Sequence, residues 1–116
     1  MADLSVQFIV QAGITPAFAA AAAGGDTFVN TPRTFVEAKN ANAASRTITI
    51  AKQISSITLG ELGTVSLADI SVVVPALTGD KMFFVPARSH SPSGRAAMSY
   101  DAATDLTLGV FELPRS

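Results

Sequence analysis

The stretch TFVEAKNANAASRTITIAK, residues 34–52, decides the fold class. Residues 46–52 alternate strictly, which places the two isoleucines on one face of an extended chain and the two threonines on the other. Residues 34–39 also have the composition of a strand, and the small polar residues 40–45 that follow them are typical of a loop. Two strands joined by a short polar loop predict a β-hairpin.

Further strand-forming segments continue on both sides of this stretch, separated by turn residues. They are rich in β-branched and aromatic residues, and prolines close several of them, where a missing N–H costs no hydrogen bond. The segments are 5–11, 27–30, 70–75, 81–86, 95–100 and 106–113. Eight or nine short strands without a long helix predict an all-β fold, an antiparallel β-sandwich of Ig-like or jelly-roll-like type.

Length and composition predict one domain with a substantial core, spanning residues 1–116. Hydrophobic residues make up 48% of the chain and charged residues 15%, which excludes an intrinsically disordered protein. In each strand, one set of alternate residues is expected to face this core. The expected core residues are Phe35, Ile48, Ile50, Val72, Val74, Phe84, Leu106 and Leu108.

Two segments lack a clear periodicity. Residues 1–26 contain five consecutive alanines, which favour a helix, but so short a tract cannot offset the cost of helix nucleation. We expect an extended or irregular segment, with a short helix as the alternative, and residues 1–26 are a candidate N-terminal arm. The segment lacks the basic start of a secretory signal, because the first basic residue is Arg33. Residues 53–69 predict a long connection with at most one short strand or helical turn.

No cluster of residues identifies a catalytic chemistry or a cofactor. The chain has no cysteine, which excludes disulfides, thiolate metal sites and cysteine nucleophiles. The single histidine, His90, cannot form a multi-histidine zinc site and is expected to be exposed in a polar loop. A net charge of -1 provides no basic surface for nucleic acid, and no apolar run is long enough to span a bilayer. We therefore expect a non-enzymatic protein without cofactor, metal, nucleic-acid or membrane partners.

Contacts with a partner protein are expected from the two segments without periodicity, because exposed apolar stretches are usually covered by a partner. Alanines there would let a neighbouring backbone approach closely. The arginines on either side of His90 form a local positive cluster that could contact an acidic surface. The candidate partner-binding residues are Phe18, Ala20, Ile57, Leu59, Leu62, Arg88 and Arg95.

The order of segments between residues 27 and 113 resembles that of a class of small tailed-bacteriophage virion proteins. The resemblance is carried by TFVEAKNANAASRTITIAK, ISVVVP, KMFFVP and the final LTLGVFEL, whereas residues 53–69 depart from the pattern. It implies an auxiliary head protein, a capsid decoration or cement protein, which binds the major capsid protein on the outside of the virion. Such a protein is made in the host cytoplasm and is often a homotrimer.

Two other interpretations stay open. The chain could be a neck, tail or baseplate component that binds another virion protein, or a secreted or surface Ig-like binding module. The position of the chain in a particle, and its copy number there, would distinguish these interpretations.

Overall fold

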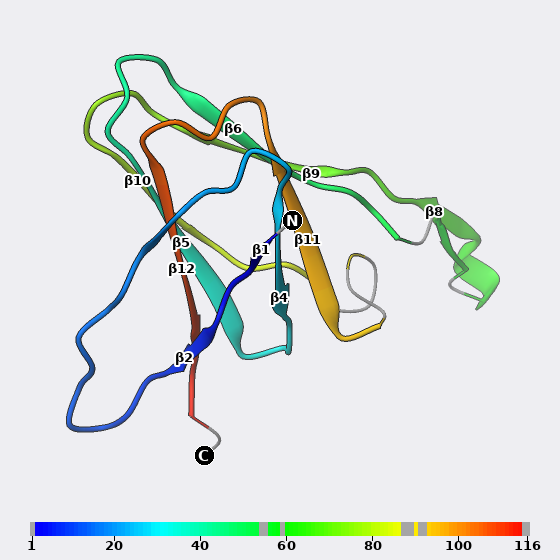
Figure 1. The fold of residues 1–116 in the computed structure, drawn as a ribbon. Coiled ribbons are helices and arrows are strands. Elements are labelled where there is room, and N and C mark those ends of the chain that lie inside the picture. Colours follow the sequence, from blue (N-terminus) through cyan, green and yellow to red (C-terminus); the bar gives the residue numbers. More distant parts are fainter. Residues whose placement is uncertain (1, 54–55, 59, 87–89, 91–92, 115–116) are drawn as a thin grey trace.

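The computed structural model describes residues 2–53, 56–58, 60–86, 90 and 93–114, with the backbone alone at residues 2, 57 and 65 (Figure 1). These residues form two β-sheets packed face to face as a sandwich, and a separate two-stranded hairpin. The prediction of an all-β sandwich is confirmed.

Sheet 1 contains five strands, mostly antiparallel. Their order is β1 (Ala2–Asp3), β4 (Asp26–Val29), β11 (Arg95–Tyr100), β6 (Arg46–Ile50) and β9 (Ile70–Val74). The exception is β1, which pairs parallel to β4. The segment around β1 therefore extends one edge of this sheet.

Sheet 2 has the order β10 (Gly79–Phe83), β5 (Thr34–Asn40), β12 (Leu106–Glu112) and β2 (Val6–Phe8). One side of β12 pairs along its whole length with β5. The other side of β12 pairs with both β2 and the short β3 (Ala19–Ala20). The alanine tract is thus extended at Ala19–Ala20 and irregular from there to a turn at Ala23, as predicted, and it forms no helix. Strands from the first 20 residues pair with both sheets.

The core lies between the sheets, where alternate residues of each strand meet. Most of the expected core residues are there: Ile48, Ile50, Val74, Leu106 and Leu108 are buried, and Val72 packs partly buried against them. The prediction was wrong for Phe84, which is 69% exposed, and for Phe35, which is half-buried on the outer face of sheet 2. The inward side chains of β5 are instead small or polar: Thr34, Val36, Ala38 and Asn40.

The predicted hairpin between β5 and β6 is wrong, because these strands belong to different sheets. The loop 41–45 carries the chain from one sheet to the other. Buried Asn40 holds this crossing, since its Nδ2 donates to the carbonyl oxygens of Ala44 (2.9 Å), Val74 (3.3 Å) and Pro75 (3.1 Å). The second of these carbonyls ends β9 and the third begins the connection to β10. One side chain therefore anchors two connections between the sheets.

The segment 53–69 forms more structure than predicted. It contains β7 (Ser56–Thr58), a 3-10 helix (Gly60–Leu62) and β8 (Thr64–Ser66), and the two strands pair antiparallel. This hairpin projects from the sandwich beyond the ends of β6 and β9 (Figure 1). Gly60 and Gly63 have positive φ angles of 59° and 90°. Glycine adopts such angles without steric cost, so these two residues permit the tight turn of the hairpin.

Candidate protein-binding surface

A row of phenylalanine rings crosses the outer face of sheet 2. Phe35 on β5 lies directly opposite Phe111 on β12, and their rings stack with centroids 5.6 Å apart. Phe18, just before β3, meets the ring of Phe111 edge-on at 6.0 Å. Nζ of Lys39 lies 4.3 Å from the centroid of the Phe18 ring, a cation–π contact that covers one end of the row.

The other end of the row is open. Met82 on β10 and Phe84 just beyond it are 62% and 69% exposed. Together with Phe35 and Phe83 they line a hollow of about 250 Å³. We refer to Phe18, Phe35, Met82, Phe84 and Phe111 as the aromatic face.

Such a face is unusual for an isolated domain, because burying one such side chain is worth roughly 1.5–3 kcal/mol. In β5 the chain instead buries an alanine and a threonine and turns Phe35 outward. Contiguous apolar residues on a surface mark places where another molecule binds. The aromatic face is therefore the strongest candidate for a binding site among the described residues.

A loop of the same chain covers the middle of the aromatic face. Ile9, Ile14 and Pro16 from this loop line a second hollow, of about 140 Å³, together with Phe35, Glu37, Met82 and Phe111. The two hollows share Phe35 and Met82, so the covered part of the face continues directly into the open part.

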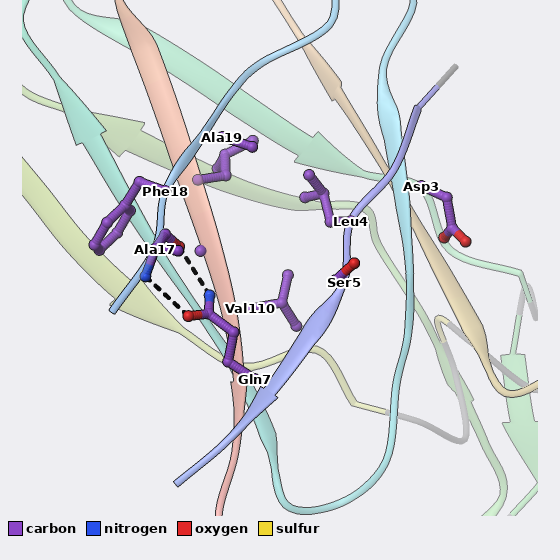
Figure 2. A pocket seen from close by; sticks show the side chains of 10 residues that line it. Asp3, Leu4, Ser5, Gln7, Ala17, Phe18, Ala19 and Val110 are labelled. Atoms are coloured by element: carbon purple, nitrogen blue, oxygen red, sulfur yellow. Dashed lines mark hydrogen bonds between the residues drawn. The ribbon is translucent and has the colours of Figure 1, made fainter. Parts of the chain in front are cut away.

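The covering loop is closed at its base by two hydrogen bonds. Nε2 of Gln7 donates to the carbonyl oxygen of Ala17, and the Ala17 N–H donates to Oε1 of Gln7 (Figure 2). Glycine at position 109 permits the loop to approach β12, because a Cβ there would lie 2.9 Å from the Phe111 ring and 3.1 Å from the Ala17 oxygen. Because Gly109 has no side chain, the covering loop and the Phe111 ring can both lie close to β12.

Two carboxyl groups border the aromatic face. Burial raises the pKa of the Glu37 side chain, and both a hydrogen bond with Asp80 and the charge of Asp80 raise it further, whereas Lys39 lowers it. Neither carboxylate forms an ion pair with a basic residue in the part of the chain that the structure describes. A partner that brings a positive charge to this point would stabilise the charged form of Glu37.

The other polar clusters hold the fold together. Tyr100 Oη donates to Oδ2 of buried Asp26 at 2.5 Å, and the Ala22 N–H donates to the same oxygen at 3.1 Å. Burial, followed by the hydrogen bond and the charge of Asp26, raises the pKa of Tyr100. These bonds fix the turn after the alanine tract to the core.

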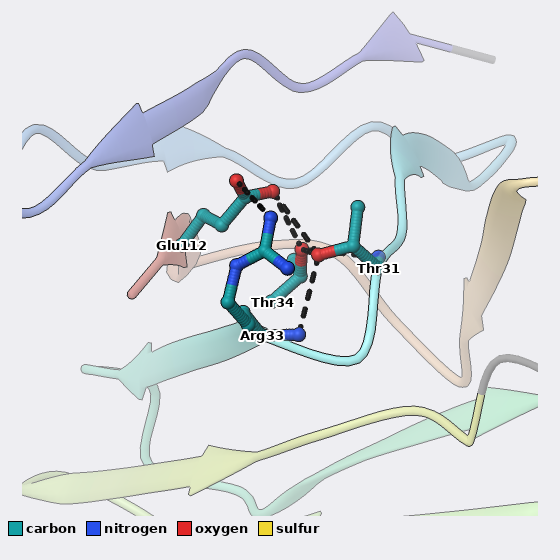
Figure 3. Close-up of polar contacts among 4 residues, drawn as sticks. All are labelled: Thr31, Arg33, Thr34 and Glu112. Atoms are coloured by element: carbon teal, nitrogen blue, oxygen red, sulfur yellow. Dashed lines mark hydrogen bonds and ion pairs between the residues drawn. The ribbon is translucent and has the colours of Figure 1, made fainter. Parts of the chain in front are cut away.

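A second cluster joins the turn before β5 to the end of β12 (Figure 3). Oε1 of Glu112 accepts hydrogen bonds from the hydroxyls of Thr31 (3.1 Å) and Thr34 (3.3 Å). Oε2 of the same carboxylate pairs with Arg33 at 3.4 Å. The Glu112 carboxylate thus joins the turn at residues 31–34 to the end of β12.

The structure scatters the candidate partner-binding residues. Of those that it describes, only Phe18 lies on the aromatic face, while Ala20 is exposed on β3 and Leu62 is 86% exposed at the hairpin tip. Arg95 forms an ion pair with Asp3. Ile57 lies in β7, but its side chain is outside the described part, as are Leu59 and Arg88 altogether.

Sequence reasoning missed Met82, Phe84 and the outward Phe35. A signal was present: in KMFFVP two adjacent phenylalanines occupy one extended segment, so one of them must point away from the core. The expectation for His90 was also wrong. His90 is only 4% exposed. Nε2 of its ring lies 3.1 Å from the backbone oxygen of Ala68, and its backbone N–H donates to the backbone oxygen of Pro86.

Within the described ranges, no group of three or more His, Asp or Glu residues could hold a metal ion. Nor does that part of the chain contain a helix long and apolar enough to cross a membrane. No protein-family model, no curated protein and no solved structure matches this chain.

Proposed function

We propose that this chain is a non-enzymatic structural protein of a phage particle, which decorates the capsid and stabilises the head lattice by binding the major capsid protein. The observation that carries the proposal is the aromatic face, with Met82 and Phe84 exposed at its open end. The virion setting is supported by the resemblance of residues 27–113 to small phage virion proteins. A protein of this kind acts by adding buried interface at many equivalent positions and needs no catalytic group.

A second exposed apolar position supports assembly. Leu62 is 86% exposed in the 3-10 helix between β7 and β8, and this hairpin projects away from sheet 2 (Figure 1). One subunit thus has two separate surfaces. Each subunit of a closed homotrimer contacts its two neighbours through two different surfaces, so a trimer that also binds a capsid needs several separate contact surfaces on one subunit.

The test is decoration of capsids that lack this chain, measured by co-sedimentation. The variant Met82→Ser/Phe84→Ser removes the open end of the aromatic face, and Val73→Ser is the matched control, because Val73 is 53% exposed on sheet 1. We expect the double variant to lose binding while the control retains it, with unchanged circular dichroism spectra for both. Equal binding by both variants would contradict the proposal.

Detection of the chain in purified particles provides an independent test. Many copies spread over the head are expected from a decoration protein. Labelling confined to one vertex or to the tail would assign it to the neck or tail instead, and absence from the particle would exclude a virion protein.

A further inference from the structure

The strand β10 has one unpaired edge. It is the outermost described strand of sheet 2, and Gly79–Phe83 pair with β5 on the other side. Alternate residues of an antiparallel strand direct their N–H and C=O groups away from the paired neighbour. Between residues 80 and 84, no backbone hydrogen bond from this outer edge is present within the described part of the chain. The edge therefore offers donors and acceptors beside the open end of the aromatic face.

The outer side chains of this edge follow a simple order. Asp80, Met82 and Phe84 succeed one another on the outer face, one acidic and two apolar, and all three are exposed. Met82 lies directly opposite Glu37 on β5, so Asp80 and Glu37 are diagonal neighbours on the outer face, and two carboxyl groups lie at the start of the edge. The nearest cation on the same face, Lys39, has its amine over the Phe18 ring. The pair of carboxyls has no ion-pair partner among the described residues.

We propose that the free edge of β10 accepts an extended segment of a partner protein as an added antiparallel strand. The segment carries apolar side chains opposite Phe84 and Met82 and a lysine or arginine opposite Asp80. This inference rests on the proposed function only in taking the chain to be a protein-binding module. Main-chain hydrogen bonds provide affinity in this mode of recognition, and alternate side chains provide specificity.

Charge complementarity favours a different protein over a second copy of this chain. Directly opposite residues of an antiparallel pair share a face, so a second β10 could place only Asp80, Met82 or Phe84 opposite Asp80. No register of that pairing provides a positive charge. Lys81, on the other face of the strand, would lie opposite itself in one of these registers, which is destabilising.

The probe is a synthetic peptide whose central residues are valine, threonine, valine, threonine and lysine, in that order. In antiparallel pairing its valines lie opposite Phe84 and Met82, and its lysine lies opposite Asp80. Binding to the isotope-labelled full chain is followed by nuclear magnetic resonance. We expect the backbone amide signals of residues 80–84 to shift, and the hydrogen exchange of those amides that face the free edge to slow.

The need for a positive charge opposite Asp80 is tested by reversing the charge on the peptide and on the protein in turn. A peptide with glutamate in place of lysine should bind about five-fold more weakly, the upper end for one cross-strand pair. The variant Asp80→Lys should reverse this preference, whereas Glu61→Lys, on the hairpin tip, should leave it unchanged. Equal affinity for both peptides in every variant would overturn the inference.

Two other results would also overturn it. One is a lysine peptide that leaves the β10 amides unaffected. The other is protection of these amides that grows with protein concentration in the absence of peptide, which would identify a second copy as the occupant. The peptide experiment does not depend on any virion. Absence from particles would therefore contradict the proposed function alone, and capsid decoration without peptide binding would contradict this inference alone.

Discussion

Gln7 and Ala17 pair as two neighbouring strands do, although one partner is a side chain. The Gln7 amide donates to the Ala17 oxygen and accepts from the Ala17 N–H, each at 2.8 Å. The side-chain amide has the same donor and acceptor as a peptide group, so it satisfies both polar atoms of Ala17. The loop over the aromatic face is thus closed by a single residue of β2.

Replacing Gln7 by alanine should loosen this loop. The substitution removes two hydrogen bonds near the surface, so we expect a loss of about 1 kcal/mol in the free energy of unfolding and faster proteolysis within residues 9–17. Denaturant unfolding and limited proteolysis measure the two effects. Gln11→Ala, an exposed change in the same loop, is the control, and equal behaviour of the two variants would show that the pairing does not hold the loop.

Ionisation of Tyr100 should be linked to unfolding. Its pKa in the folded chain is raised above the ordinary value of 10.0, so the stability that this group contributes is present in full below pH 10.0 and is lost as the pH rises toward the folded value. Tyr100 is the only tyrosine, so the change in ultraviolet absorbance when tyrosinate forms reports this group alone. Tyrosinate should appear together with unfolding, and the variant Tyr100→Phe should lose this linkage. Ionisation at pH 10.0 in the folded chain would contradict the prediction.

Replacing Glu37 by glutamine should stabilise the protein at neutral pH. The pKa of Glu37 is raised above its ordinary value of 4.5, so the fold disfavours the charged carboxylate, and the associated stability is complete below pH 4.5 and declines above it. Glutamine carries no charge at any pH. The gain in the denaturation midpoint should therefore be present at neutral pH and vanish below pH 4.5. A gain that is independent of pH would show that packing, not charge, is responsible.

Two large apolar residues should respond in opposite ways to truncation. Ile50 is fully buried, so Ile50→Ala should lower the free energy of unfolding by about 2 to 5 kcal/mol. Phe84 is largely exposed, so Phe84→Ala should change it by about 0.5 kcal/mol or less. Denaturant unfolding compares the two directly. A larger loss at Phe84 would mean that the aromatic face is part of the core.

The class of fold followed from local pattern, but the arrangement of the strands did not. Alternation in residues 46–50 correctly identified Ile48 and Ile50 as buried, because alternate side chains of a strand face the core in any sandwich. The alternation could not distinguish a hairpin from a connection between two sheets, because both have the same sequence pattern of a strand, a polar loop and a second strand. That choice depends on the carbonyls to which Asn40 donates, and two of them, at the end of β9 and at the residue after it, are distant in sequence.

The aromatic face was not predicted from the sequence, because the largest apolar side chains were assumed to be buried. Large apolar residues were expected to face the core, and in β5 this assumption selected Phe35 instead of Val36 and Ala38. Val36 and Ala38 are fully buried in the core, whereas Phe35 stacks on Phe111 outside it. Only Phe18 of the aromatic face was selected beforehand as a contact residue, and it was selected for its segment and not for its ring contact with Phe111.

The central place of β12 in sheet 2 has a kinetic consequence. β12 comes after every other described strand in the chain, yet β5, β2 and β3 all pair with it. During synthesis β2 and β3 have no partner in sheet 2, and β5 has only β10, until residues 106–112 have left the ribosome, so sheet 2 is completed in one late step. Pairing between residues from opposite ends of a chain makes folding slow. Until that step, a cell that makes this protein must keep its unpaired strands from aggregating.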